Sequence, residues 1–209
     1  MRDKERLHLA RVMKMRAVMH ISWEYPPWVV GGLSQELKSL LPEIAKRVRT
    51  MLVVRGDTDG VTEEEGVRIF KSASSIRSSP HILAYIHALN IDLLRGASAA
   101  IHEEGSVPLV HTHDWVSGIA GVYIKACFGA PLVTSVYTTE LTRSKALGSL
   151  LSMGIFDIER HCFNRSDLVV VKSPEMKEHL KENFGLDGGK IALARNADEL
   201  MEAYRGIQG

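Results

Sequence analysis

Two histidines stand at the end of an apolar run, in the segment His111-Thr112-His113-Asp114-Trp115. If that run is a strand, its alternation puts His111 and His113 on the same face. Two imidazoles on one face can chelate a metal ion, but a zinc or two-metal site needs further ligands at recognisable spacing. The residues that follow break the H-x-H-x-D-H pattern, so no metal site is predicted. The pattern favours two hydrogen-bonded histidines that line a cleft.

A glycine pair, Gly31-Gly32, lies between a predicted strand and a predicted helix. Free backbone N–H groups and the positive end of the helix dipole suit an anion at such a place, and glycine lets a phosphate approach the backbone closely. A tight turn explains a glycine pair equally well, and neither G-x-G-x-x-G nor G-x-x-x-x-G-K-[ST] is present. The residues alone leave both interpretations open.

A third polar segment, residues 137–143, follows another apolar run and supplies a carboxylate, Glu140, and a guanidinium, Arg143. These two side chains can serve a ligand or simply pair at the surface, where an ion pair contributes little stability. The chain shows no Ser-His-Asp order, no G-x-S-x-G elbow and no Cys/His nucleophile pair. No catalytic residue is therefore assigned.

The elements around these segments alternate between apolar runs and helical patterns, which is typical of a parallel sheet built from βα units. The fold class predicted is α/β: a doubly wound, mostly parallel, Rossmann-like sheet forming one domain over residues 1–209. Ligands of such sheets bind beyond the carboxyl ends of the strands, which directs attention to loops 23–32, 113–117 and 137–143. Strands are predicted at 16–22, 50–55, 67–71, 109–112, 132–137, 168–172 and 191–194.

The predicted helices cover 33–48, 80–103, the segment after 113, 147–165, 174–185 and 196–209, with a possible extra helix at 1–13. Pro42 lies inside the first of these patterns, where a kink or break is expected. Ser173 as N-cap, Pro174 at the first helical position and Gly185 at the end delimit the helix over 174–185. Asn196 is the expected cap of the terminal helix.

Composition excludes several classes of protein. The chain of 209 residues is 45% apolar and 24% charged, with a net charge of +1, so neither nucleic acid nor an anionic membrane is an expected partner. No run approaches the ~18–20 apolar residues of a membrane span. The charged first residues lack the apolar core of a secretory signal. Cys127 and Cys162 show no C-x-x-C spacing, and free thiols fit a reducing compartment, so the expected location is the cytoplasm.

Taken together, the motifs resemble those of a known enzyme class. The stretch Trp23-Glu24-Tyr25-Pro26-Pro27, followed by Val30-Gly31-Gly32-Leu33, is similar to the opening loop of retaining GT-B glycosyltransferases of the glycogen and starch synthase type. The H-x-H-D-W segment at 111–115 and the segment around 139–143 are similar to further loops of these enzymes. Residues 158–169 and 190–196 resemble the elements that end their N-terminal domain. Motifs in this order over residues 16–196 indicate a GT-B N-terminal domain.

The resemblance implies an acceptor-side domain whose C-terminal, nucleotide-binding partner domain lies outside this chain. The implied function is transfer of glucose from a sugar nucleotide, ADP- or UDP-glucose, to an α-glucan, carried out only with a separate C-terminal half or in a homo-oligomer, without a cofactor. Gly31 and Gly32 would approach the donor phosphates. The acceptor-side or sugar-binding residues implied are Glu24, Tyr25, His111, His113, Asp114, Trp115, Tyr137, Glu140 and Arg143.

Two alternatives stand beside this function. One is a non-catalytic α-glucan-binding or regulatory module that keeps only the acceptor face, and the other is a metal-dependent hydrolase using His111 and His113. Departures from the family pattern favour the non-catalytic module. Val29-Val30 replaces a lysine that synthases often carry, and Asn196-Ala197 replaces Asn-Gly. Tyr137 replaces an active-site histidine, and a phenol that titrates near pH ~10 is not an equivalent acid–base group.

Removing the partner domain also has a consequence for the surface. Trp23, Tyr25, Trp28 and Trp115 are expected in a solvent-facing groove, which would favour self-association or a docked partner, because large exposed apolar patches usually mark interaction sites. The opposing expectation is that loop 23–30 folds inward and buries its own aromatic side chains.

Overall fold

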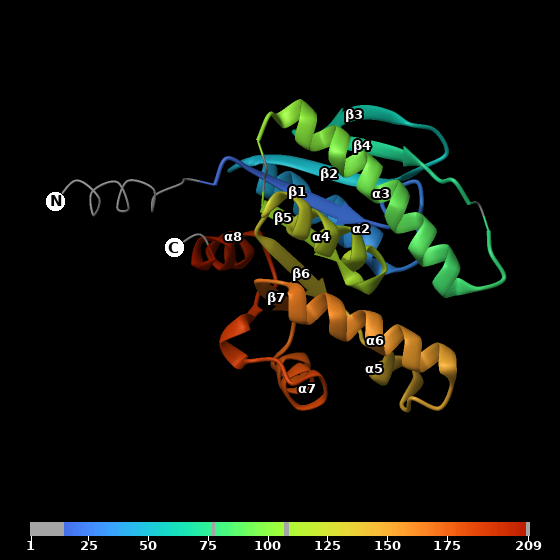
Figure 1. The fold of residues 1–209 in the computed structure, drawn as a ribbon. Coiled ribbons are helices and arrows are strands. Elements are labelled where there is room, and N and C mark those ends of the chain that lie inside the picture. Colours follow the sequence, from blue (N-terminus) through green and yellow to red (C-terminus); the bar gives the residue numbers. More distant parts are fainter. Residues whose placement is uncertain (1–14, 77, 107–108, 208–209) are drawn as a thin grey trace.

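The computed structural model describes residues 15–76, 78–106 and 109–207. Its centre is an eight-stranded sheet in the order β3-β4-β2-β1-β5-β6-β7-β8, in which every neighbouring pair is parallel except β3 with β4 (Figure 1). The predicted doubly wound, mostly parallel α/β fold is confirmed. The strands are β1 (Ala17–Ser22), β2 (Arg49–Gly56), β3 (Gly60–Glu64), β4 (Val67–Ala73), β5 (Leu109–His113), β6 (Leu132–Val136), β7 (Leu168–Val171) and β8 (Ile191–Leu193).

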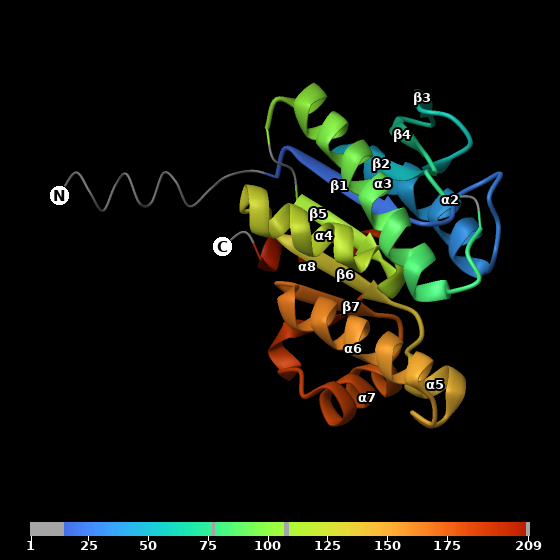
Figure 2. The same ribbon diagram turned by 45° about the vertical axis from the view of Figure 1, so that its right-hand side comes forward.

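Helices cover both faces of this sheet (Figures 1 and 2). On one face α3, α4 and α6 pack over strand residues such as Met19 and Val110, and on the other α2 and α8 pack over Val18 and Leu109. Most strands are buried on both sides, which is why they read as continuous apolar runs. The helices are α2 (Gly32–Ala45), α3 (Ile82–Glu104), α4 (Asp114–Phe128), α5 (Glu140–Ser144), α6 (Leu150–Arg165), α7 (Pro174–Phe184) and α8 (Ala197–Gly206).

Local sequence signals delimit several of these helices as expected. Ser173 caps α7 by accepting a hydrogen bond from the Met176 N–H, Pro174 is its first residue, and Gly185 ends it in the left-handed conformation with φ of 66°. Asn196 caps α8 through the Glu199 N–H. Each cap satisfies backbone groups that a helix end leaves without an intrahelical partner.

Two glycines of helix α4 face side chains of neighbouring elements. A Cβ at Gly121 would overlap Thr112 Cγ2, and one at Gly118 would come within 2.7 Å of Cys162 Sγ. Glycine at these positions therefore lets α4 pack against β5 and α6. The consequence for the site is that α4 starts directly at the carboxyl end of β5, with Asp114 following His113.

The structure departs from the sequence predictions at three elements. Strand β3 was not predicted, because Gly60–Glu64 is polar and exposed and is held only by antiparallel pairing with β4. Pro42, where a kink or break was expected, does not break the helix: α2 continues through it to Ala45, so the proline falls in the last turn. Segment 140–144 is a short helix rather than a loop. The helix predicted for residues 1–13 lies outside the described residues.

The chain reverses its direction across the sheet between β1 and β5. From β1 it runs outward through β2, then returns to β5 on the other side of β1 and continues outward to β8. In open α/β sheets, ligands bind at the carboxyl ends of the strands on either side of such a switch point. Within the described residues, no helix has both the length and the apolar character needed to cross a membrane.

Candidate functional site

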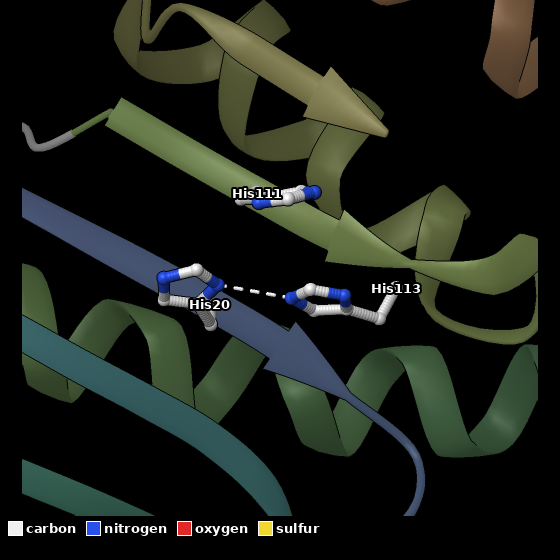
Figure 3. Close-up of side chains that lie close together, drawn as sticks. All are labelled: His20, His111 and His113. Atoms are coloured by element: carbon white, nitrogen blue, oxygen red, sulfur yellow. Dashed lines mark hydrogen bonds between the residues drawn. The ribbon is translucent and has the colours of Figure 1, made fainter. Parts of the chain in front are cut away.

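Three buried histidines meet at the switch point. His20 on β1 pairs in register with His111 on β5, and His113 lies two residues further along β5, so alternation puts all three on the face covered by α2 and α8. The rings are fully buried, with centroids 4.3 to 5.2 Å apart. Figure 3 shows them converging between the two strands, with the hydrogen bond from His20 Nδ1 to His113 Nε2 at 2.9 Å. His20 was not among the predicted site residues.

Tyr137 extends this group toward the carboxyl edge of the sheet. Its hydroxyl lies 3.1 Å from His113 Nδ1 and donates to Glu36 Oε1 on α2 at 3.3 Å. Glu36 in turn forms an ion pair of 2.9 Å with Lys172, the residue after β7. Burial, and then the charge of Glu36, hold the pKa of the Tyr137 phenol well above its usual value. Tyr137 therefore stays protonated and acts as a hydrogen-bond donor.

His111 is turned into the core rather than toward the edge. Its Nδ1 lies 2.5 Å from the Tyr204 hydroxyl on α8, and its Nε2 lies 2.8 Å from Ser135 Oγ on β6. Tyr204 is fully buried, so this contact fixes α8 on the sheet as well as the imidazole. His111 thus holds other groups in place and does not reach the carboxyl edge.

All three imidazoles are neutral at ordinary pH. Burial lowers the pKa of His20 to about 3 and lowers the pKa values of His111 and His113 well below 6.5, where the neighbouring rings and the positive charge of Lys172 act in the same direction. A neutral imidazole carries one N–H and one lone pair, so each ring in this group is both a donor and an acceptor.

A second polar cluster lies on the other face of the sheet, at the same edge. Arg143 Nη2 pairs with Glu140 Oε2 at 3.1 Å and with Glu159 Oε1 at 2.9 Å, and its guanidinium lies 5.8 Å from the centre of the Trp115 ring. Glu159, on α6, is fully buried and accepts two hydrogen bonds from the Glu140 N–H, at 2.8 and 2.9 Å. The structure therefore pairs Glu140 with Arg143, and it adds Glu159, for which no role was predicted.

Asp114 stands between the two clusters, at the junction of β5 and α4. Its backbone is in the left-handed region, with φ of 65°, which is rare for a residue with a side chain and recurs at functional sites. Its Oδ1 accepts from the Trp115 N–H at 2.9 Å. Burial raises the pKa of this carboxyl to about 6, opposed by that hydrogen bond and by Arg143. With Glu140 and Glu159, Asp114 makes three carboxylates around one guanidinium, and burial also raises the pKa of Glu159 to about 7.

The loop before α2 is organised by Glu24. This carboxylate is buried, and its Oε2 accepts hydrogen bonds from the N–H groups of Val30 and Gly31, both at 2.8 Å. The Gly31 N–H predicted to receive a donor phosphate is therefore already bonded within the chain. In the described part of the chain, a Cβ added at Gly32 would meet no atom within 4 Å, and one added at Gly31 would lie 3.7 Å from its nearest neighbour, Glu24 Oε1.

The predicted groove of exposed aromatic side chains is wrong in part. Tyr25 and Trp115 are buried, at 3% and 7% exposure, and Trp23 and Trp28 are half-buried. Arg55 lies over the rings of Trp23 and Trp28, at 5.9 and 4.9 Å from their centres. Packing of loop 23–30 against its own domain therefore covers most of the aromatic surface, and Val29 and Val30 are the large apolar side chains it leaves exposed.

Comparison with known proteins agrees with the fold described above. Residues 30–197 match the family model described as Glycosyltransferase Family 4. A glycogen synthase from Mycobacterium tuberculosis is 27% identical over 203 residues, which cover 87% of this chain and 48% of that protein. An alpha-maltose-1-phosphate synthase from Mycolicibacterium smegmatis is 24% identical over 194 residues, covering 91% and 46%. The chain spans about half the length of these relatives.

Among solved structures, sucrose-phosphate synthase from Thermosynechococcus elongatus superimposes with a TM-score of 0.68 at 16% identity, over 85% of this chain and 47% of that one. Similarity at this identity concerns the fold alone, and the fold is that of one half of a GT-B glycosyltransferase. The predicted resemblance to a GT-B N-terminal half is confirmed by these matches and by the family model.

Several residues that build the site lay outside the sequence prediction, among them His20, Glu36, Glu159 and Lys172. His20 is a polar residue inside an otherwise apolar strand, 93 positions from its partner His113, and Glu159 lies 19 positions after Glu140. Lys172 follows a buried strand directly, as the other site residues do. An isolated polar residue in a fully buried strand next to the switch point is the signal that identifies His20.

Proposed function

This chain belongs to Glycosyltransferase Family 4, and we propose that it supplies the acceptor-side half of a sugar-nucleotide-dependent glucosyltransferase that extends an α-glucan. Transfer from ADP- or UDP-glucose takes place only with a nucleotide-binding half that lies outside these residues. The name of one relative, a glycogen synthase, supports this choice of acceptor class. The matched residues form about half of each relative.

The observation that carries the proposal is the space around the glycine pair. Neither Gly31 nor Gly32 has a left-handed backbone, and among the described residues a side chain at either would meet nothing closer than 3.7 Å, so the fold itself does not require glycine. We take close approach by a ligand as the reason for glycine at both positions, and the N–H of Gly31 is already bonded to the Glu24 carboxylate. The N-terminus of the 14-residue helix α2 suits an anion such as a donor diphosphate. Stabilising that charge is usually the largest catalytic contribution in such transfers.

The acceptor side of the proposed site lies across the same edge. Asp114, Tyr137, Glu140 and Arg143 offer acceptors and donors for sugar hydroxyls, and the backbone of Asp114 is in the left-handed region. The remaining predicted residues act through these: His113 orients Tyr137, Trp115 supports Arg143, and Glu24 shapes the glycine loop. Tyr25 and His111 lie deeper and serve the packing of α2 and α8.

Acceptor binding is tested by titrating the chain with maltoheptaose and following backbone and indole NMR signals. We expect saturable shifts around residues 113–115 and 137–143, abolished by Asp114→Asn. Glu63→Gln, which changes an exposed acid on β3, serves as the matched control and should bind like the wild type. A wild-type spectrum unchanged by maltoheptaose would remove the support for an α-glucan acceptor.

Transfer is tested with radiolabelled ADP-glucose and UDP-glucose and glycogen as acceptor. The isolated chain is expected to transfer no glucose, because the nucleotide-binding half is outside it and because Tyr137 stands where the resemblance places a histidine. Robust glucose transfer by the pure chain would overturn the proposal that transfer needs a separate nucleotide-binding half.

The alternative function, a non-catalytic α-glucan-binding or regulatory module, is favoured by one specific observation. Tyr137 is tied to Glu36 and its pKa is raised well above 10, so it cannot exchange a proton at neutral pH. If maltoheptaose binds tightly to the chain alone and no nucleotide-binding half restores transfer, the module is the better description.

A further inference from the structure

We propose that His20, His111 and His113 form a three-histidine site for a first-row transition metal ion, with Zn²⁺ as the best-fitting ion. The proposal is independent of the glucosyltransferase function. One nitrogen from each ring lies within 4.8 Å of one nitrogen from each of the others, and all three rings are buried. The sequence predicted no metal site because two histidines are too few, and β1 supplies the third.

The direction of the hydrogen bonds leaves a free lone pair on His20. Glu36 only accepts, so the Tyr137 hydroxyl donates to it, and the Tyr137 oxygen then accepts from Nδ1–H of His113. His113 Nε2 is therefore a lone pair, which accepts from His20 Nδ1–H. His20 Nε2 must then carry a lone pair too.

That second nitrogen of His20 has no partner. Among the described residues, Nε2 of His20 is a buried polar atom without any hydrogen bond. A buried polar atom left unpaired costs free energy, and such exceptions need an explanation. A metal ion is a partner for a lone pair, and the lone pair of His113 Nε2 already points toward the His20 ring (Figure 3).

Binding an ion here requires a half-turn of one ring and small shifts in the distances between the nitrogens. Zn²⁺ bound tetrahedrally at ~2.0–2.1 Å from each nitrogen places those nitrogens about 3.3 Å apart. His20 Nδ1 and His113 Nε2 are 2.9 Å apart, slightly too close, and the ligand atoms of the trio lie within 4.8 Å, slightly too far. A half-turn of the His20 ring about Cβ–Cγ brings Nε2, with its lone pair, to the position that Cε1 holds now and puts Cδ2 in place of the Nδ1–H, without loss of a proton. Neutral imidazole nitrogens suit Zn²⁺.

Groups around the trio match those that orient metal-bound histidines elsewhere. Ligand histidines usually donate their second N–H to an oxygen that is itself held in place. His113 donates to Tyr137, which is anchored on the Glu36 carboxylate, and His111 keeps one hydroxyl partner, on Ser135 or Tyr204, whichever nitrogen binds the ion. Glu36 also supplies negative charge near the neutral ligand set, partly offset by its ion pair with Lys172.

The test is a titration of chelator-treated protein with Zn²⁺ by calorimetry, in a Cys127→Ser background because Cys127 is an exposed thiol. We expect one saturable tight site that disappears in His20→Gln. His161→Gln, a histidine on α6 outside the trio, is the matched control and should bind like the parent. Tyr137→Phe should weaken binding by about 10- to 100-fold, as loss of an outer hydrogen bond to a ligand histidine does.

Co²⁺ provides a readout that does not depend on a variant folding. Bound by three imidazoles in a four-coordinate site, Co²⁺ gives intense visible absorption, and addition of Zn²⁺ should remove it. The proposal is overturned if the parent shows no such absorption. It is equally overturned if His20→Gln, folded by circular dichroism, binds Zn²⁺ as the parent does.

Discussion

Two polar clusters at one edge of the sheet keep titratable side chains buried, one as neutral groups and the other as an ion pair. On the α2 and α8 face, His20, His111 and His113 are buried as neutral rings joined to hydroxyl groups. On the α6 face, the buried carboxylate of Glu159 is paired with the guanidinium of Arg143, whose side chain is 34% exposed. Burial penalises the charged form in both, so the first cluster avoids charge and the second compensates it.

The difference predicts opposite responses to acid. A neutral buried histidine resists the proton that the unfolded chain takes up below pH ~6.5, whereas a crowded buried carboxylate takes up a proton more readily than it does in the unfolded chain. The neutral cluster therefore loses stability as the pH falls, and the charged cluster gains some. Four experiments break or sharpen this comparison.

The largest effect expected is acid destabilisation by the neutral cluster. The folded pKa of His20 is lowered to about 3, and those of His111 and His113 are lowered well below 6.5, so their stability is fully present above pH ~6.5 and is lost as the pH falls. Each histidine lowers the free energy of unfolding by about 1.4 kcal/mol per pH unit below that pH, so the three together lower it by about 4 kcal/mol per pH unit. Urea unfolding followed by tryptophan fluorescence at pH 7.5 and 5.5 measures it.

His20→Gln provides the control for that pH dependence. Removing one of the three titrating rings should reduce the slope by about 1.4 kcal/mol per pH unit, whatever the variant does to stability at pH 7.5. A wild-type free energy of unfolding that is the same at both pH values would show that the histidines are not buried as neutral groups.

The next largest effect expected comes from removing an acceptor in the charged cluster. Glu159→Ala leaves the Glu140 N–H without its partner and removes one carboxylate from Arg143. The loss of hydrogen bonds to a buried charged group lowers the free energy of unfolding by about 3 kcal/mol. Asp157→Ala on the same helix breaks an exposed pair with Arg160 and should cost under ~0.5 kcal/mol. If the two variants lose the same free energy of unfolding, the hydrogen bonds of Glu159 to the Glu140 N–H and to Arg143 do not stabilise the fold as proposed.

The sequence predicted more of the fold than of the candidate site. The strands at β1, β5, β6 and β7 were predicted because burial on both faces leaves continuous apolar runs. Strand β3 was not, because its exposed residues are held by pairing with β4 and carry no apolar pattern. Tertiary pairing overrides weak local preference in such edge strands.

Each polar cluster was predicted only as far as its members share a segment. His111 and His113 are two residues apart on a strand, and Glu140 and Arg143 are three residues apart on a helix. In each pair the spacing alone brings the two side chains together. His20 and Glu159 join through the order of the strands and the packing of α6, which no local pattern records. The orientation of Glu24 onto Val30 and Gly31 was missed for a similar reason, since a carboxylate in a loop has no preferred partner until the loop is folded.

A smaller effect expected is the reversed pH dependence of the charged cluster. The pKa of Glu159 is raised from 4.5 to about 7, so the folded state binds the extra proton between these values and this group makes stability fall as the pH rises through them. Glu159→Gln cannot titrate and should remove up to about 1.4 kcal/mol per pH unit of that trend, which makes the acid loss of the variant steeper than that of the wild type. If the free energy of unfolding of the variant changes with pH between ~5 and ~7 as that of the wild type does, the proton is taken up by another carboxyl group.

The smallest effect expected tests how the neutral cluster holds α8. Tyr204→Phe keeps the buried ring and removes only the hydroxyl that lies 2.5 Å from His111 Nδ1, while Ser135 still bonds the other nitrogen. One lost neutral hydrogen bond should lower the free energy of unfolding by about 1 kcal/mol. Tyr123→Phe, at an exposed position on α4, should change it by under ~0.5 kcal/mol. If both tyrosine variants are equally stable, the packing of the Tyr204 ring, rather than its bond to the histidine, holds α8 on the sheet.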